Sequence, residues 1–219
     1  PGGQSSGTAS YSAVKEITSD ETIKDETYSS ENSDENAVLA TGSITAQLSD
    51  TTITKTGDSD GGDTSNFYGN NSGITAKDGA ALTLKNMKIT TDASGANGVF
   101  SYGGSATTSN SSGDGTSVTI TDSEITTTGD NAGGIMTTGG GTMTASYLTI
   151  NTSGRSSAAI RTDRGGGSVD VTGGTYTTTG IGSPSVYSTA DIVVSNARLV
   201  AKASEGIVIE GKNSVTLND

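Results

Sequence analysis

The chain has 219 residues, of which 30% are hydrophobic and only 4% aromatic, and it contains no His, Cys or Trp. Without His or Cys it cannot build a Ser-His-Asp or Cys-His nucleophile, a thiolate metal site or a disulfide bond. Its formal net charge of −12 leaves no basic stripe for phosphates, which argues against nucleic acid as a partner. No stretch approaches the roughly 20 apolar residues of a transmembrane helix.

Gly, Ser and Thr make up nearly half of the chain, a composition also found in disordered polymers. Against disorder, the chain has only two Pro residues, and its Ile, Val and Leu residues recur at regular intervals. These features predict repetitive β structure with a thin core. An acidic, Cys-free chain of this kind fits an exported bacterial protein, so we expect it to be secreted or displayed on the cell surface.

The first part of the chain divides into two segments of different character. Residues 1–10 (PGGQSSGTAS) have the composition of a flexible linker. Residues 11–36 place four apolar residues at strand-like spacing among acidic ones. We expect this second segment to form an opening coil or cap, because a solenoid must blunt its first strand edge to avoid aggregation.

Residues 37–219 contain an internal repeat marked by seven small residues that each precede Ile or Val. These Ile and Val anchors lie 36, 25, 36, 25, 26 and 21 residues apart, which indicates a period of about 25 residues with two insertions of about eleven. The anchors are Val38, Ile74, Val99, Ile135, Ile160, Val186 and Ile207.

Each anchor is followed by an alternating apolar pair, and a third apolar residue comes five residues later, beyond a tight turn. Alternation with a period of two predicts strands. Three short strands in each repeat are the signature of an all-β fold, a right-handed parallel β-helix, here of about seven coils plus the opening coil. The turn residues, which tolerate a left-handed backbone, are Asp50, Asn86, Asp122, Gly173, Gly174 and Asn196.

The last repeat, residues 205–219, begins the same pattern with Val215 and Leu217 and has no polar closing segment. We expect its open edge to be continued by further chain or covered by another copy that stacks end to end. A self-assembling filament subunit is therefore one function that the sequence allows.

Several runs of the sequence resemble a family of secreted, adhesin-like right-handed β-helix proteins of gut Firmicutes, which share their architecture with pectate lyases. These runs are ENAVLATG, GGIMTTGGGTMT, SSAAIRTDRGGG and ASEGIVIEGKNSVTLND. The resemblance covers about residues 11–219. It implies export and adhesion at a surface, and it supplies no catalytic residues.

The residue after each anchor points outward if the anchor points inward. On the middle coils these outward positions gather aromatic and charged side chains, next to the insertion at residues 103–116. Aromatic rings stack on sugars and charged groups hold hydroxyls, so we predict a patch that binds a glycan or a surface protein. The alternative is that this stripe packs under the insertions. The predicted ligand-binding residues are Phe100, Tyr102, Met136, Arg161, Asp163 and Tyr187.

The tetrapeptide at residues 161–164 is the most enzyme-like motif. In β-helix polysaccharide lyases an Arg or Lys acts as base, which makes Arg161, Asp163 and Arg164 catalytic candidates by resemblance. An Arg base needs strong tuning because its ordinary pKa exceeds about 12, and the neighbouring coils hold Thr instead of further carboxylates. The same gap argues against a glycoside hydrolase. The alternative is an Arg-Asp pair that braces the glycine turn at residues 165–167.

Residues 57–66 form a loop with three carboxylates and an amide at close spacing. Hard oxygen ligands at alternate positions suit calcium, although the loop lacks the distal Glu of an EF-hand. A solvated acidic loop is the alternative. The candidate ligands are Asp58, Asp60, Asp63 and Asn66, and calcium is the one cofactor that the sequence suggests.

The sequence as a whole predicts an exported adhesion module that is not an enzyme and presents one face of a β-helix to a glycan or protein. A β-helix lyase or glycoside hydrolase is the first alternative, and a self-assembling subunit is the second. The outward patch, the loop at residues 57–66 and the end at residues 205–219 are the places where these hypotheses differ.

Overall fold

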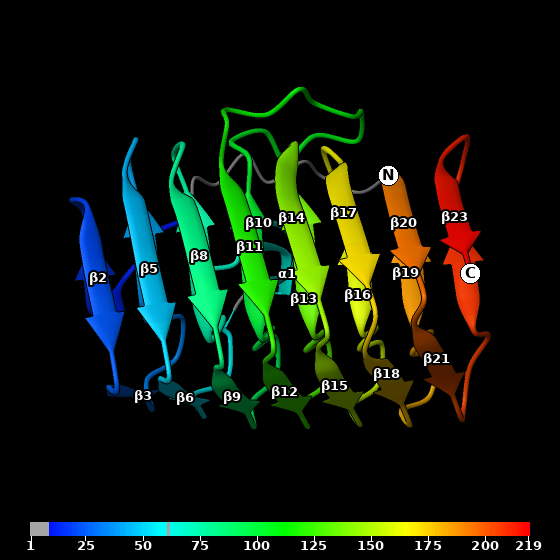
Figure 1. Ribbon diagram of the computed structural model, residues 1–219, viewed down its shortest axis with the longest axis horizontal. Coiled ribbons are helices and arrows are strands. Elements are labelled where there is room, and N and C mark those ends of the chain that lie inside the picture. Colours follow the sequence, from blue (N-terminus) through cyan, green and yellow to red (C-terminus); the bar gives the residue numbers. More distant parts are fainter. Residues whose placement is uncertain (1–8, 61) are drawn as a thin grey trace.

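The computed structural model describes residues 9–60 and 62–219, and this part of the chain forms a right-handed parallel β-helix (Figure 1). Three parallel sheets run along the rod, two with eight strands and one with seven. The predicted fold class is confirmed. Most of the predicted linker, residues 1–8, lies outside the described residues.

Sheets A and B take one strand from each of eight coils and sheet C takes one from each of the first seven, so the strands of a coil belong to different sheets. Sheet A contains β1 (Ala13–Ile17), β4 (Asn36–Thr41), β7 (Ile74–Lys77), β10 (Val99–Tyr102), β13 (Ile135–Thr138), β16 (Ile160–Thr162), β19 (Val186–Ser188) and β22 (Ile207–Ile209). Sheet B contains β2 (Glu21–Lys24), β5 (Thr45–Ser49), β8 (Ala81–Lys85), β11 (Ser117–Thr121), β14 (Gly141–Ser146), β17 (Gly167–Thr172), β20 (Asp191–Ser195) and β23 (Ser214–Asn218). Sheet C contains β3 (Thr27–Ser30), β6 (Thr52–Lys55), β9 (Lys88–Thr91), β12 (Glu124–Thr127), β15 (Thr149–Thr152), β18 (Thr175–Thr178) and β21 (Arg198–Ala201).

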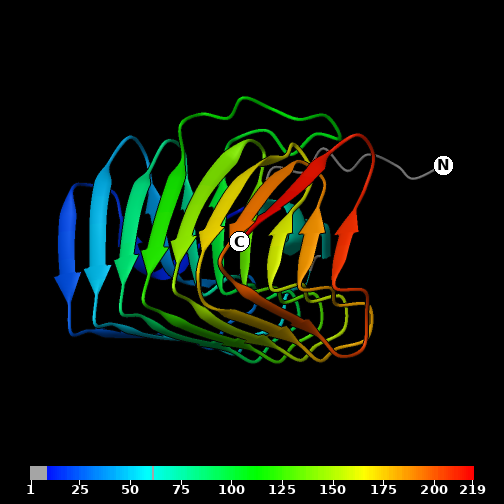
Figure 2. The ribbon, with the colours of Figure 1, turned by 45° about the vertical axis from the view of Figure 1, so that its right-hand side comes forward.

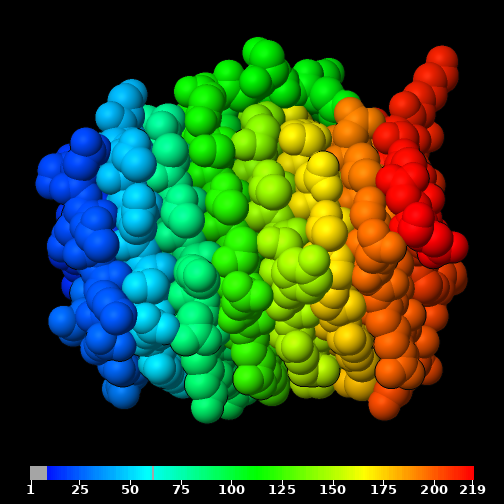
Figure 3. All heavy atoms as spheres, in the orientation of Figure 1, coloured from blue at the N-terminus to red at the C-terminus, as the bar shows by residue number. Residues whose placement is uncertain are grey.

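The coils, numbered 1 to 8 from the strands of sheet A, stack as parallel bands along the rod (Figures 2 and 3). Residues 11–36, expected as an opening coil or cap, contain β1, β2 and β3, which pair with β4, β5 and β6. Every backbone ladder is parallel, so each coil satisfies its N–H and C=O groups through the coils beside it.

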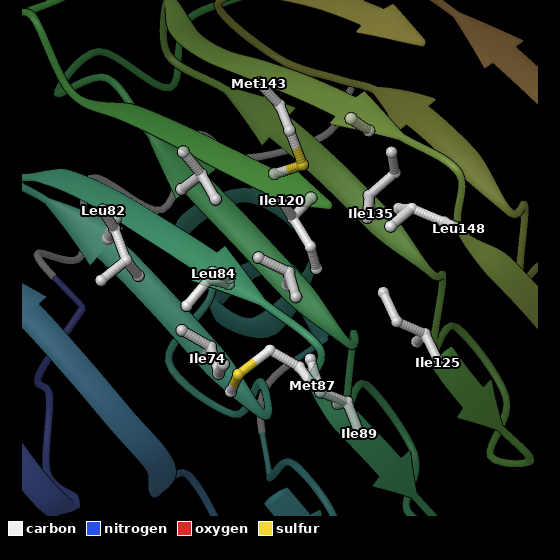
Figure 4. Close-up of a cluster of buried hydrophobic side chains, with 14 of the residues drawn as sticks. Ile74, Leu82, Leu84, Met87, Ile89, Ile120, Ile125, Ile135, Met143 and Leu148 are labelled. Carbon is white, nitrogen blue, oxygen red and sulfur yellow. The ribbon is translucent and has the colours of Figure 1, made fainter. Parts of the chain in front are cut away.

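The core is a column of inward side chains enclosed by the three sheets (Figure 4). The predicted anchors from Val38 to Val186 are all buried in this core, together with the alternating pairs that follow them. Figure 4 shows Leu82 and Leu84 of β8 beside Ile74 of β7. Burying a side chain of this size contributes about 1.5–3 kcal/mol, so a few per coil support an otherwise polar chain.

The corner between sheets B and C is turned in each of the first seven coils by a residue in the left-handed region. The predicted turn residues all lie at these corners and have positive φ, so the prediction is confirmed. Asp, Asn and Gly adopt this conformation at little cost. Coil 5 departs from it and uses Tyr147, with φ 53°. The corner residues are Asp25, Asp50, Asn86, Asp122, Tyr147, Gly173 and Asn196.

A ladder of buried hydroxyl groups ends sheet C and explains part of the high Thr content. In four coils a Thr Oγ1 donates to the carbonyl oxygen five residues later, at 2.5–2.6 Å. These residues are Thr91, Thr127, Thr152 and Thr178. In coil 2 the ladder position is Lys55, whose Nζ donates to the carbonyl oxygens of Asn32 (2.8 Å) and Gly57 (2.7 Å). Burial lowers the pKa of Lys55 to about 8.

Both predicted insertions lie next to strands of sheet A. The first comes directly before β7, and the second comes directly after β10. The first contains α1 (Gly62–Tyr68), a short helix that the sequence did not predict, which lies against the outer face of sheet A. The second, residues 103–116, rises above the strand ends and bends toward the later coils (Figures 1 and 2). No helix within the described ranges has the length and apolarity to cross a membrane.

The two ends of the rod differ in chemistry. In coil 1 the inward positions opposite Val38 and Ala46 are held by Lys15 and Glu21, which form an ion pair at 2.8 Å. Inward-pointing charges of this kind discourage pairing at a strand edge. At the other end the last coil carries apolar side chains, and Leu217 is 55% exposed.

Candidate functional site

The outward positions of sheet A form a ladder that crosses all the central coils. Strand pairing aligns Thr75 with Phe100, Phe100 with Met136, Met136 with Arg161 and Arg161 with Tyr187. The side chains predicted to form one patch are therefore neighbours in the sheet. Their surroundings divide them into a covered half and an exposed half.

The covered half consists of Phe100, Tyr102 and Met136. Phe100 and Met136 are fully buried, and Tyr102 is 9% exposed. They pack with Tyr68 of α1 and Ala106 of the second insertion into a small hydrophobic core outside the solenoid. The predicted exposure of these three side chains is wrong, because the two insertions fold back over them. The alternative, that the stripe packs under the insertions, is confirmed for this half.

Specific contacts hold α1 in place over these side chains. Thr138 Oγ1 donates to the carbonyl oxygen of Phe67 at 2.8 Å, and the Tyr11 hydroxyl donates to that of Tyr68 at 2.6 Å. The rings of Tyr68 and Tyr102 meet edge to face, with centroids 5.4 Å apart. Gly69 follows the helix with φ +71°, and a Cβ there would lie 2.6 Å from Cγ of Phe100. The segment therefore fits closely against the sheet.

The other half, called exposed because it borders pockets, begins with Arg161 and Asp163 on and just after β16, and each of these two side chains is only 14% exposed. The guanidinium of Arg161 donates to Asp163 Oδ2 from Nε (3.1 Å) and from Nη2 (2.5 Å). Asp163 Oδ1 accepts from the backbone N–H of Arg164 at 2.8 Å, and the Asp163 carbonyl accepts from Gly166 at 2.8 Å. The pair braces the glycine turn, as the second interpretation of this tetrapeptide predicted.

Tyr187 and Glu210 complete the exposed half. The Arg161 guanidinium lies 5.6 Å from the centroid of the Tyr187 ring, within range of a cation–π contact. Partial burial is the main cause that raises the pKa of Tyr187, and hydrogen bonding with the Glu210 carboxylate is the second cause. Sequence reasoning assigned no role to Glu210, because it looked for a second carboxylate only on the coils directly beside Asp163. Glu210 holds the same outward register two coils further on.

We call Arg161, Asp163, Tyr187 and Glu210 the sheet A cluster. A pocket of about 210 Å³ lies on its Arg161 and Tyr187 side, and one of about 350 Å³ lies on its Asp163 and Glu210 side. The first is lined by Asn131, Ser156, Ala158, Arg161, Gly182, Pro184 and Tyr187. The second is lined by Thr108, Asn110, Asp163, Arg164, Gly165, Gly166, Thr189, Glu210, Gly211 and Asn213.

Arg164 links the exposed half to α1. Its guanidinium lies 3.9 Å from the centroid of the Phe67 ring, and Nη1 lies 3.8 Å from the Asp63 carboxylate. Arg164 also lines the larger pocket. The side chain is therefore held between the helix and the pocket wall, where it contributes positive charge.

The four predicted calcium ligands are not gathered at one point. Asp58 accepts a backbone hydrogen bond from Ser94 at 2.7 Å, and the Asp60 N–H donates to Asp34. Asp63 and Asn66 belong to α1, where Asp63 faces Arg164. Within residues 9–60 and 62–219 no group of three or more Asp, Glu, His or Cys side chains has an arrangement that could hold a metal ion.

Comparison with known proteins adds no template for this face. No protein-family model, no curated protein and no solved structure matches this chain. The parallel β-helix is established by the strand pairing of the chain itself, and the function of the sheet A cluster is inferred from its residues.

Proposed function

We propose that the chain is a binding module that holds a glycan against the exposed half of sheet A. The observation that carries this proposal is the sheet A cluster, in which an aromatic ring lines one pocket beside Arg161, and the carboxylates of Asp163 and Glu210 line a second. Sugar recognition uses this combination, because a ring stacks on the apolar face of a pyranose while polar groups hold its hydroxyls.

The charges of the cluster favour a neutral, hydroxyl-rich glycan. Two guanidinium groups, of Arg161 and Arg164, are matched by the carboxylates of Asp163 and Glu210. Because these charges balance, the cluster has no net charge to attract a charged sugar, and a neutral sugar can use the guanidinium groups as donors and the carboxylates as acceptors. Amides and hydroxyls of the larger pocket add further partners.

Export and display at a cell surface are part of the same proposal. They are supported by the resemblance of several sequence runs to adhesin-like β-helix proteins. A rod whose outer face is rich in polar residues suits a module that presents a fixed surface. A surface protein is the other partner that the same face would suit, and the test below separates the two.

The test is a glycan-array screen of the purified chain, followed by titration of each hit with Tyr187→Ala. We expect this variant to bind about 5- to 30-fold more weakly, the loss of an aromatic contact worth about 1–2 kcal/mol. Val14→Ala, an exposed change on coil 1, is the matched control and should bind like the parent. No retention on the array would overturn the glycan proposal and direct the search to a protein partner or to self-association.

Catalysis is the second candidate, because Tyr187 lies near two carboxylates, those of Asp163 and Glu210. Asp163 is less suited to a chemical role, since both its oxygens are already engaged by Arg161 and Arg164. Glu210 is therefore the candidate acid or base. If any bound glycan is cleaved, Glu210→Gln should abolish product formation and keep most of the binding, because the amide oxygen still accepts hydrogen bonds. Intact glycan after long incubation with the parent chain would remove this candidate.

A further inference from the structure

An exposed aromatic residue, Tyr147, occupies a backbone position that disfavours it. In the other coils this corner belongs to Asp, Asn or Gly, which adopt positive φ readily. Tyr147 adopts φ 53° with a bulky side chain and is 65% exposed, so burial does not offset the strain. The geometry of the coil does not account for a Tyr at this point.

Gly173 of the next coil holds the Tyr147 ring in place. A Cβ on Gly173 would lie 2.7 Å from both Cδ1 and Cε1 of Tyr147, so one edge of the ring rests against the glycine. The backbone is fixed as well, because the Tyr147 N–H donates to the Thr172 carbonyl at 2.9 Å. A ring that is already braced loses little conformational freedom when a ligand stacks on it.

A groove of about 460 Å³ runs beside Tyr147 across coils 3 to 5. Pairing in sheet C places Lys88 opposite Glu124 and Glu124 opposite Thr149, so polar groups repeat along the groove at the coil spacing of about 4.8 Å. Its lining residues are Asn86, Met87, Lys88, Asp122, Ser123, Glu124, Tyr147 and Thr149.

We propose that Tyr147 and this groove form a second glycan site, on the corner of the rod opposite sheet A. This corner runs along the lower front of Figure 1, between sheets B and C. The ring supplies a stacking surface, and Lys88, Glu124 and Asn86 supply donors and acceptors for hydroxyl groups. The site is separate from the sheet A cluster and shares no residue with it.

The charges of the groove select a neutral sugar. One ammonium, of Lys88, stands against the carboxylates of Asp122 and Glu124. A uronic acid or sulfated sugar would be repelled by these two carboxylates, whereas the hydroxyls of a neutral hexose or pentose bond to either kind of group. The predicted ligand is an uncharged oligosaccharide.

The deciding variant is Tyr147→Asn, which installs the residue type found at this corner in coils 3 and 7. Because it relieves the strained backbone, its melting temperature should equal that of the parent or exceed it by a few degrees. A drop of several degrees would identify Tyr147 as a residue needed for folding and would overturn the proposal.

Binding is measured with immobilised gluco-, manno-, galacto- and xylo-oligosaccharides. For at least one of them, Tyr147→Asn should bind at least 5-fold more weakly, while Tyr147→Phe, which keeps the ring, should bind like the parent. A glycan whose binding depends on Tyr147 and survives Tyr187→Ala is assigned to this corner. If none of these oligosaccharides shows a loss with Tyr147→Asn, the second site does not exist, whatever happens at the sheet A cluster.

Discussion

The two halves of the outer face of sheet A belong to one ladder of outward positions, but one half is covered and the other borders pockets. Met136 and Arg161 are direct partners in the sheet, yet Met136 is fully buried and Arg161 borders a pocket. The difference comes from α1 and residues 103–116, which pack Tyr68 and Ala106 onto Phe100 and Met136 of coils 4 and 5, whereas beside the later coils residues 103–116 form part of a pocket wall. On a β-helix, therefore, an outward position becomes core or surface according to where the insertions fold. Here the covered positions hold apolar and aromatic side chains, and the open ones hold charged side chains and Tyr187.

The largest effect on stability is expected when a side chain of the covered half is truncated. Phe100→Ala should lower the free energy of unfolding by about 3–5 kcal/mol, because it leaves a cavity under α1. Tyr187→Ala, its counterpart in the exposed half, should cost only about 1 kcal/mol, since its ring is partly solvated. Urea unfolding of both variants measures the difference in the free energy of unfolding. An equal decrease in the two variants would show that both side chains are packed to the same degree.

A second test concerns the attachment of residues 103–116 to the exposed half. Gly165 has φ +79°, and a Cβ there would lie 2.0 Å from the Ser105 carbonyl oxygen, so Gly165→Ala should cost about 2–4 kcal/mol and displace the insertion. Gly182→Ala is the matched control, because Gly182 also has positive φ but nothing lies within 4 Å of its Cβ position. It should cost only about 1 kcal/mol. Unfolding free energies and protease cleavage within 103–116 distinguish the two.

Lys55, at the base of the first insertion, predicts a dependence of stability on pH. Its pKa falls from 10.5 in the unfolded chain to about 8 in the fold, so between these values the unfolded state binds more protons. The free energy of unfolding therefore rises with pH from about 8 to 10.5, and Lys55 is least favourable below pH 8.

The measurement for Lys55 compares the parent with Lys55→Thr, the residue that holds this ladder in later coils. Between pH 8 and 10.5 the parent should gain on the order of 2 kcal/mol relative to the variant. The comparison cancels the tyrosines, which both proteins share. A difference that stays constant across this range would contradict a buried, destabilised ammonium.

The smallest effect is expected from the ion pair between Arg164 of the exposed half and Asp63 of α1. The Arg164 and Asp63 pair is exposed and 3.8 Å long, so Asp63→Asn should change the free energy of unfolding by no more than about 0.5 kcal/mol. The packing of Arg164 on Phe67 should persist. A larger loss that disappears in high salt would show that electrostatics, and not the apolar core under α1, holds the helix.

Local patterns account for what could be predicted of the fold. The period of about 25 residues, the inward anchors such as Ile74 and the corner residues such as Asn86 all follow from side-chain alternation and turn chemistry. Each coil repeats these local rules and pairs only with its neighbours. A β-helix is therefore a fold that periodicity alone can identify.

The candidate site was predicted only in part. Arg161, Asp163 and Tyr187 were named from their outward register and do form one cluster. Phe100 and Met136 carried the same signal, and nothing local distinguishes an outward side chain that will be covered. Glu210 was assigned no role because it lies two coils beyond Asp163, and the coils directly beside Asp163 hold Thr138 and Thr189 at this register.

The sequence by itself determined the repeat, the three strands of each complete coil and the inward and outward face of nearly every position, since these depend on residues within one coil. The tertiary structure alone decided which outward side chains meet solvent, because that depends on contacts between segments far apart in the chain, such as Phe67 with Thr138 and Ser105 with Gly165. The path of an insertion across several coils leaves no periodic trace in the sequence. That path decides which part of the outer face of sheet A stays open.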